Sequence, residues 1–281
     1  MTTFTSHDGL RLRYRTIGSG PPLLVVPGGP RASSYLGDLG GLAEHRTLVL
    51  YDARGTGGSD APDPAEREAA AYPALAQDVH TLRRHLGLER VDVLGHSAGT
   101  VVAQAAAAAD PGAFTSLTLV TPGGDLFGVP PTDIGEVLAG RAEEPWFDQA
   151  KAALTALFSL GPDAPAEQVA AALLDYAPAA YGHWEAPAKE HVARQQAEFA
   201  LTAWQGFWGA GPPANPVLVD RLRTLTLPVL VLTGSRDALS GVAIGDHVAA
   251  VYPDAVHRTI PGAGHYPWVD EPARFVEAIT S

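Results

Sequence analysis

The stretch that decides the fold is Val91-Asp92-Val93-Leu94-Gly95-His96-Ser97-Ala98-Gly99-Thr100, an apolar run that leads into Gly-x-Ser-x-Gly. The small apolar residues that follow, up to position 109, predict a helix. A side chain on a sharp strand-to-helix turn has strained backbone angles, so the positions two before and two after it must be small. The helix N-terminus beneath the turn then stabilises developing negative charge. The pattern predicts Ser97 as a nucleophile, against the alternative of a chance turn in a glycine-rich chain.

Short apolar runs alternate with helical patterns on both sides of this stretch. The runs that predict strands occupy residues 10–16, 23–26, 47–51, 91–94, 117–120, 229–232 and 256–260. Helices are predicted over residues 72–86, 98–109, 244–251 and 272–279. Continuous apolar runs bounded by glycine and proline are typical of parallel strands covered on both faces. The alternation therefore predicts an α/β fold with a mostly parallel, doubly wound sheet.

The segment over residues 122–226 interrupts this alternation. It is rich in alanine, proline and glycine, shows no clear strand, and holds four of the five tryptophans, at positions 146, 184, 204 and 208. We expect a helical cap insertion over 122–226, resting on a core made of residues 1–121 and 227–281. The tryptophans fit either the interior of the cap or the apolar roof of a substrate pocket.

Composition excludes several classes of protein. The 281 residues are 46% apolar and 18% charged, as in a soluble globular chain. A net charge of −12 repels phosphate backbones, so we expect no nucleic-acid partner. The absence of cysteine excludes disulfides, thiolate nucleophiles and cysteine-based zinc sites, and fits a cytoplasmic location. We find no signal-peptide pattern and no run of 18 uncharged apolar residues, and so expect no membrane association.

A serine hydroxyl needs a neighbouring base before it acts as a nucleophile. His265 is the best of ten histidines, because it lies on a glycine-containing loop between the last predicted strand and the last predicted helix. Asp237 follows the predicted strand at 229–232 on another such loop, and is the candidate acid that orients the histidine. Asp246 and Asp254 are weaker candidates, since they fall in or after the next predicted helix.

Acyl transfer also needs two backbone N–H groups that receive the developing oxyanion. The residue after the nucleophile, Ala98, is expected to supply one of them. The loop Pro27-Gly28-Gly29-Pro30, after an early predicted strand, is expected to supply the other through Gly29. The alternative for this loop is a simple turn.

The sequence holds two further motifs besides the loop Pro27-Gly28-Gly29-Pro30-Arg31. They are Asp52-Ala-Arg54-Gly55-Thr-Gly57-Gly-Ser59, and His183-Trp184-Glu185 inside the expected cap. Together with the chain order serine, aspartate, histidine, they resemble the α/β-hydrolases over the whole chain, and within them the proline iminopeptidase branch of serine peptidases. The resemblance implies an α/β-hydrolase fold with a cap. It also implies that Glu185 holds the free amino group of a substrate. We expect Arg54 to brace its own loop.

The chain also departs from that branch. Pro27 stands where the branch has histidine, and Arg31 where it has glycine. The turn around the nucleophile, which we call the elbow, reads Gly95-His96-Ser97-Ala98-Gly99 and is of a type shared by many esterases. We place His96 among the candidate substrate-binding residues, with Trp184 and Glu185.

Three functions remain open at this stage. The first is hydrolysis of a small ester or lactone through an acyl-enzyme on Ser97. The second is removal of an N-terminal residue from a short peptide or amide, and the third is a non-hydrolytic protein of the same fold, such as a cyclase or a ligand receptor. No nucleotide-binding or zinc motif occurs, so we predict no cofactor and no metal. We expect a small-molecule or short-peptide substrate, and the sequence carries no indication of oligomeric state.

Overall fold

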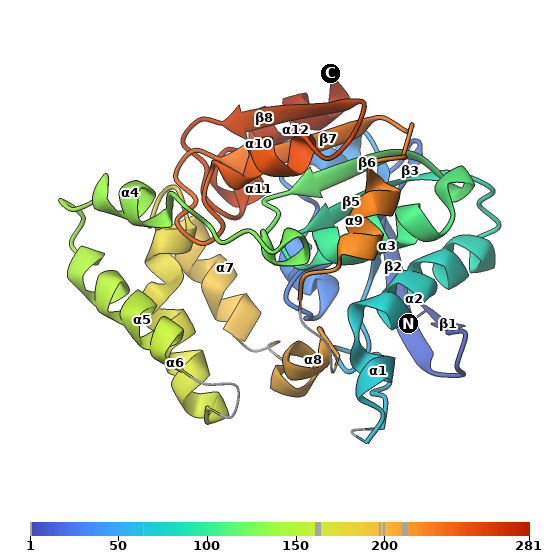
Figure 1. The fold of residues 1–281 in the computed structure, drawn as a ribbon, viewed down its shortest axis with the longest axis horizontal. Coiled ribbons are helices and arrows are strands. Elements are labelled where there is room, and N and C mark those ends of the chain that lie inside the picture. Colours follow the sequence, from blue (N-terminus) through green and yellow to red (C-terminus); the bar gives the residue numbers. More distant parts are fainter. Residues whose placement is uncertain (1, 64, 161–163, 197, 199, 210–212) are drawn as a thin grey trace.

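An eight-stranded sheet forms the centre of the protein, in the order β1-β2-β4-β3-β5-β6-β7-β8 (Figure 1). The computed structural model describes residues 2–281 apart from 64, 161–163, 197, 199 and 210–212. The six strands from β4 to β8 run parallel, whereas β1 and β2 pair antiparallel at one edge. The predicted α/β class with a mostly parallel sheet is confirmed.

The strands match the predicted apolar runs, with one addition. Their bounds are β1 (Thr2–Thr5), β2 (Arg11–Ile17), β3 (Pro22–Val26), β4 (Thr47–Tyr51), β5 (Val91–His96), β6 (Phe114–Val120), β7 (Val229–Gly234) and β8 (Ala255–Ile260). The sequence did not indicate β1, because only Phe4 of its residues is buried. The expectation that β8 is covered on both faces is wrong, since β8 is an edge strand and Val256 is 50% exposed.

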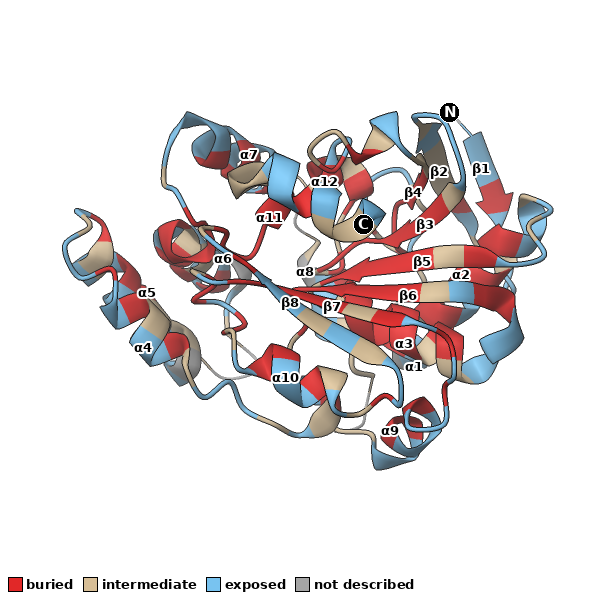
Figure 2. Cartoon of the chain, turned by 90° about the horizontal axis from the view of Figure 1, so that it is seen from above, coloured by how far each residue is buried: buried red, intermediate tan, exposed pale blue. Residues whose placement is uncertain are grey.

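Helices cover both faces of the sheet, as Figure 2 shows from above. One face carries α2 (Tyr72–His85), α3 (Gly99–Ala109), α9 (Pro216–Leu222) and α10 (Ile244–Ala249). The other carries the 3-10 turns η1 (Ser33–Leu36) and η2 (Leu42–Glu44), with α11 (Pro267–Asp270) and α12 (Pro272–Thr280). Shorter elements are α1 (Arg67–Ala70), η3 (Pro111–Ala113) and η4 (Asp125–Phe127). No helix within the described residues is long and apolar enough to span a bilayer.

The helices between β6 and β7 project to one side of the sheet (Figure 1). They are α4 (Ile134–Ala139), α5 (Phe147–Ser159), α6 (Ala166–Tyr176), η5 (Ala177–Ala180), α7 (Ala186–Gln196) and α8 (Leu201–Gly206). In contrast, α9 lies inside the expected cap segment but packs on α3, and its Leu218 and Leu222 join the core beneath the sheet. Residues 216–222 therefore pack with the core rather than with the cap helices.

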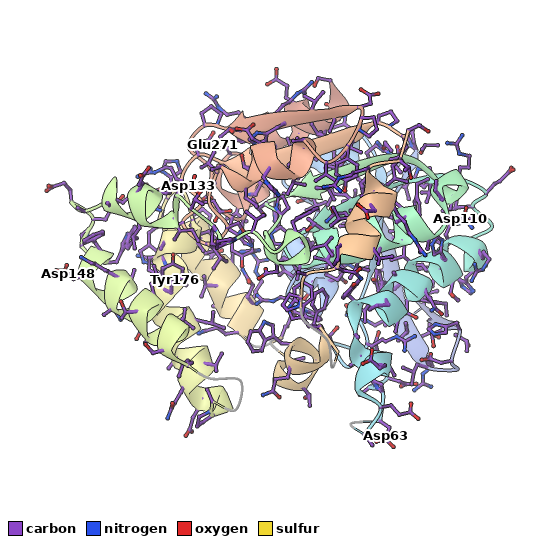
Figure 3. The ribbon with its side chains drawn as sticks, viewed as in Figure 1. Asp63, Asp110, Asp133, Asp148, Tyr176 and Glu271 are labelled. Carbon is purple, nitrogen blue, oxygen red and sulfur yellow. The ribbon has the colours of Figure 1, made fainter. Side chains whose placement is uncertain are left out.

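Two side chains labelled in Figure 3 join the cap to the loop after β7. The Asp133 carboxylate accepts hydrogen bonds from the amides of Val242 and Ala243, each at 2.9 Å. The Tyr176 hydroxyl, at the end of α6, donates to the carbonyl of Ala238. The cap is therefore tied to the same loop that carries Asp237.

A buried ion pair braces the loop after β4. The Arg54 guanidinium donates to both oxygens of Asp78 on α2, at 2.5 and 2.7 Å, and also to Asp8 near the N-terminus. Arg54 and Asp78 are both buried, whereas the Asp8 side chain is 33% exposed. Arg54 therefore does more than brace its own loop: it ties that loop to α2 and to the turn between β1 and β2.

Removal of the Asp78 charge is expected to destabilise the protein far more than removal of the Asp8 charge. Asp78→Asn leaves the buried Arg54 charge poorly compensated, a loss worth about 3–5 kcal/mol. Asp8→Asn removes a partner that water screens, worth less than about 1 kcal/mol. Urea denaturation measures both losses, and equal values for the two variants would contradict this assignment.

A buried histidine docks α7 onto the core. The Nε2 atom of His191 donates to the carbonyl of Tyr35 at 2.8 Å, and its Nδ1 atom accepts from the Tyr181 hydroxyl at 2.7 Å. Burial lowers the pKa of His191 from 6.5 to about 4. The ring is therefore neutral in the folded protein, and both nitrogens have partners only in that state.

The free energy of unfolding is expected to fall as the pH drops from about 6.5 to about 4. In this window the unfolded chain binds a proton at His191 that the folded protein does not, so acid favours unfolding. One such histidine contributes at most about 1.4 kcal/mol per pH unit. Denaturation curves at several pH values test this, with His191→Gln expected to show a shallower dependence. An unchanged slope in that variant would show that His191 contributes nothing.

Candidate active site

The carboxyl ends of β3, β5, β7 and β8 meet at one edge of the sheet, where parallel α/β folds bind ligands. Ser97 follows β5, Asp237 lies three residues past β7, and His265 lies five residues past β8. Gly29 follows β3 on the neighbouring loop. The sheet order thus gathers residues that lie up to 236 positions apart in the chain.

Ser97 occupies a strained turn between β5 and α3. Its φ angle is 51°, a left-handed conformation that is costly for a residue with a side chain. A Cβ atom on Gly95 would lie 2.5 Å from the carbonyl oxygen of Gly99, and one on Gly99 would lie 2.5 Å from the carbonyls of Val26 and Pro27. Only glycine fits at both positions. The turn places Ser97 directly before the N-terminus of α3, whose dipole favours negative charge there.

His265 and Asp237 form a buried pair. Nδ1 of His265 lies 3.0 Å from Oδ2 of Asp237, and both side chains are at most 2% exposed. The other oxygen of Asp237 accepts hydrogen bonds from the amides of Leu239 and Ser240, which fix the carboxylate. A carboxylate at Nδ1 keeps the proton on that nitrogen and leaves Nε2 as the basic one. His265 and Ser97 line the same cavity.

Two backbone amides at the cavity are candidate hydrogen-bond donors to an oxyanion. Gly29, with φ 106°, and Ala98 both border the cavity that Ser97 lines. No acceptor within the described residues takes either of their amide hydrogens. The amide of Gly28 is instead engaged, since it donates to the Tyr35 hydroxyl at 2.7 Å. The amides of Gly29 and Ala98 are thus without an acceptor among the described residues, and their role as oxyanion donors stays a prediction.

His96 does not present a free ring nitrogen to a substrate. Its Nδ1 atom lies 2.8 Å from the Tyr35 hydroxyl, and its Nε2 atom donates to the carbonyl of His265 at 3.0 Å. The ring borders the cavity, yet it is 2% exposed, and burial lowers its pKa well below the usual 6.5. The ring joins the glycine loop to the His265 loop through both of its nitrogens, and the substrate-binding role of His96 stays a prediction.

The cavity has a volume of about 570 Å³ and mixed walls from the core and the cap. Apolar side chains of α5 and α6 form one wall, among them Leu154, Leu157 and Leu173. Trp204 and Trp208 border it, whereas Trp146 and Trp184 pack in the cap interior. Trp146 and Trp184 thus belong to the interior of the cap, and Trp204 and Trp208 to the wall of the cavity.

Glu185 and Trp184 lie away from this cavity. Glu185 is exposed, and both residues border a separate surface hollow of about 450 Å³ with Lys189 and His183. They directly precede α7, whose Ala188 and His191 are buried. The role implied for Glu185 by the resemblance is not supported, because its carboxylate does not border the cavity of Ser97. The same position excludes Trp184 from that cavity.

Three residues at the site carried no signal in the sequence. Tyr35 lies in η1 and belongs to no motif, and Thr121 directly follows β6 with a φ of 45°. The hydroxyl of Thr121 donates to the carbonyl of His265 at 3.1 Å. The hydroxyl oxygen of Ser240 lies 3.3 Å from Nδ1 of His265. Among the described residues, we find no group of three or more acidic or histidine side chains that could hold a metal ion.

Two proteins of known sequence are similar to this chain. An uncharacterised protein of Mycobacterium tuberculosis is 28% identical over 98% of this chain and 79% of its own length. A proline iminopeptidase of Heyndrickxia coagulans is 35% identical, but over only 37% of this chain and 36% of its own.

Solved structures superpose on nearly the whole chain. The esterase RhEst1 from Rhodococcus sp. ECU1013 has a TM-score of 0.72 and 26% identity, covering 99% of this chain and 96% of that one. A proline iminopeptidase of Mycobacterium smegmatis has a TM-score of 0.73 at 22% identity over 99% and 96% of the two chains, a likeness of fold alone. The family model of the alpha/beta hydrolase fold matches residues 21–272. With the sheet, the elbow and this match in agreement, the chain belongs to the alpha/beta hydrolase fold family.

Proposed function

We propose that the protein is a serine hydrolase that cleaves a small ester or lactone through an acyl-enzyme on Ser97. The observation that carries the proposal is the buried Asp237–His265 pair, which opens onto the same cavity as Ser97 on its strained turn. Nucleophile, base and orienting acid are the three groups that this chemistry requires.

In the proposed reaction, His265 takes the proton of the Ser97 hydroxyl as the oxygen attacks the substrate carbonyl. The oxyanion that forms accepts hydrogen bonds from the amides of Gly29 and Ala98. His265 then gives the proton to the departing alcohol, and the acyl group remains on Ser97. A water molecule attacks the acyl-enzyme by the same steps, which releases the acid and restores the serine. Asp237 stays ionised throughout and stabilises the imidazolium.

The cavity supports an ester or lactone rather than a peptide with a free N-terminus. A substrate ammonium group needs a carboxylate held beside the scissile carbonyl, since a buried unpaired charge is costly. Glu185, the residue that the peptidase alternative requires, borders a different hollow. The leucine wall from α5 and α6 suits an apolar acyl or alcohol group instead. The presence of all three catalytic groups argues against a protein that only binds its ligand.

Ser97→Ala is expected to lower hydrolysis of p-nitrophenyl butyrate at least about a thousandfold, because no acyl-enzyme can form. Ser240→Ala is the matched control, since Ser240 borders the same cavity and lies beside the same histidine. It loses two long hydrogen-bond contacts, to the Thr121 carbonyl and to Nδ1 of His265, each worth at most about 1 kcal/mol, or roughly fivefold in rate. Release of p-nitrophenol measures both variants, and aminoacyl p-nitroanilides run in parallel test the peptidase alternative.

Full activity in Ser97→Ala would overturn the proposed nucleophile. Faster cleavage of the aminoacyl anilides than of the esters by the wild-type protein would overturn the proposed substrate class while leaving the nucleophile in place.

Tyr35→Phe is expected to lower kcat about 10- to 100-fold with little change in KM. The lost hydroxyl holds the Gly28 amide and His96, so the neighbouring Gly29 amide shifts from the oxyanion, which exists only in the transition state. Tyr51→Phe is the control, because the buried Tyr51 hydroxyl has no hydrogen-bond partner among the described residues. Steady-state kinetics decide the matter, and a change in KM alone would contradict the positioning role.

A further inference from the structure

Arg31 directly follows the glycine loop and borders the cavity of Ser97. It also borders an adjoining cavity of about 480 Å³ between α6 and α7. The two cavities share Arg31, Leu173, Tyr176, Leu239 and Tyr266. No other lysine or arginine of the described chain borders either cavity, so Arg31 is the basic group that a substrate would meet there.

Several neighbouring groups hold the Arg31 side chain in place. It runs along Gly29 so closely that a Cβ on that glycine would lie 2.7 Å from Nε of Arg31. Its guanidinium carbon lies 5.7 Å from the centre of the Tyr35 ring, and Nη1 donates to the amide oxygen of Gln195. Gln195 is itself fixed, since its oxygen also accepts from the Tyr266 hydroxyl at 3.0 Å. These contacts orient the guanidinium at the edge of the cavity.

The charge of Arg31 acts on His96, the residue before Ser97. Burial and the neighbouring His265 lower the pKa of His96, and the positive charge of Arg31 adds to this effect. The carboxylates that border the cavities, Asp125 in the first and Glu167 in the second, are exposed and therefore screened by water. A negatively charged group in the cavity would thus experience Arg31 more strongly than either carboxylate.

We propose that Arg31 binds a carboxylate of the substrate, so that the substrate class is an ester or lactone that carries an acid group on its acyl or its alcohol side. Guanidinium and carboxylate groups match in shape and form paired, charge-assisted hydrogen bonds. The position of Arg31 beside Gly29 would hold such a substrate with its scissile carbonyl near the oxyanion donors. This inference rests on the proposed function and adds the recognition of charge to it.

Matched ester pairs test the inference, each an acid and its neutral amide. Mono-p-nitrophenyl adipate against p-nitrophenyl adipamate places the charge on the acyl side. 4-Carboxyphenyl butyrate against 4-carbamoylphenyl butyrate places it on the alcohol side. In the wild-type protein, one of the two pairs is expected to show kcat/KM at least about tenfold higher for the acid, equivalent to about 1.4 kcal/mol.

Arg31→Gln is expected to abolish this preference, which is measured as the ratio of kcat/KM for the acid to kcat/KM for its neutral partner, so that a general loss of activity does not affect the result. Arg31→Lys keeps the charge without the planar fork, and is expected to retain part of the preference. Arg194→Gln is the control, because Arg194 is an exposed arginine of α7 that borders neither cavity. It removes the same charge and is expected to leave the preference intact.

Two results would overturn the inference: no preference for the acid in either pair, or an equal preference in wild type and Arg31→Gln. Both leave the proposed hydrolysis standing, provided that the neutral esters are cleaved in a Ser97-dependent manner. Loss of all ester cleavage in the wild-type protein would instead refute the proposed function itself.

Discussion

The site depends on one close approach of two backbones. The loop after β3 passes so near the Ser97 turn that a Cβ on Gly28 would lie 2.6 Å from the carbonyl of His96 and 2.9 Å from the Cβ of Ser97. Gly95 and Gly99 are similarly confined on either side of the turn. A larger residue at any of these positions would force the loop and the turn apart. The strained φ of Ser97 persists because the surrounding packing leaves it no alternative.

Tyr35 connects this contact to the rest of the molecule. Its hydroxyl joins the Gly28 amide to His96, and the ring of His96 reaches the carbonyl of His265. Its own carbonyl accepts from His191 on α7, so one residue links the glycine loop, the elbow, the His265 loop and the cap. Buried polar chains of this kind are stable only when every member is satisfied. Both histidines are neutral in the fold, because burial lowers the pKa of each.

The sequence predicted most of the fold because buried parallel strands have a distinct pattern. Runs of apolar residues between helices were sufficient for seven strands, whereas β1 has a single buried side chain and no such pattern. The candidate nucleophile, base and acid were found because each follows a predicted strand, and the carboxyl ends of parallel strands share one edge. Their catalytic roles stay predictions.

The sequence did not indicate the residues that tertiary packing brings to the site, and it placed one residue at the wrong hollow. Tyr35 and Ser240 come to the site by tertiary packing, which no local motif records. Glu185 was expected at the cavity because the His183-Trp184-Glu185 motif resembles the cap motif of the iminopeptidase branch, but a motif does not say which hollow of the folded protein its side chains border. His96 was placed among the candidate substrate-binding residues; its ring borders the cavity, but the sequence did not indicate that both of its nitrogens bond within the protein.

The measurement that most directly tests the account is the trapping of an acyl-enzyme during turnover. On rapid mixing with p-nitrophenyl acetate, we expect a burst of p-nitrophenol equal to the concentration of protein, followed by slower steady release. After acid quenching, peptide mass analysis should find the acetyl group on the peptide that contains Ser97. An acetyl group on a different residue, or hydrolysis by the wild-type protein with no acylated peptide and no burst under conditions where deacylation is slow, would contradict a covalent mechanism at the elbow.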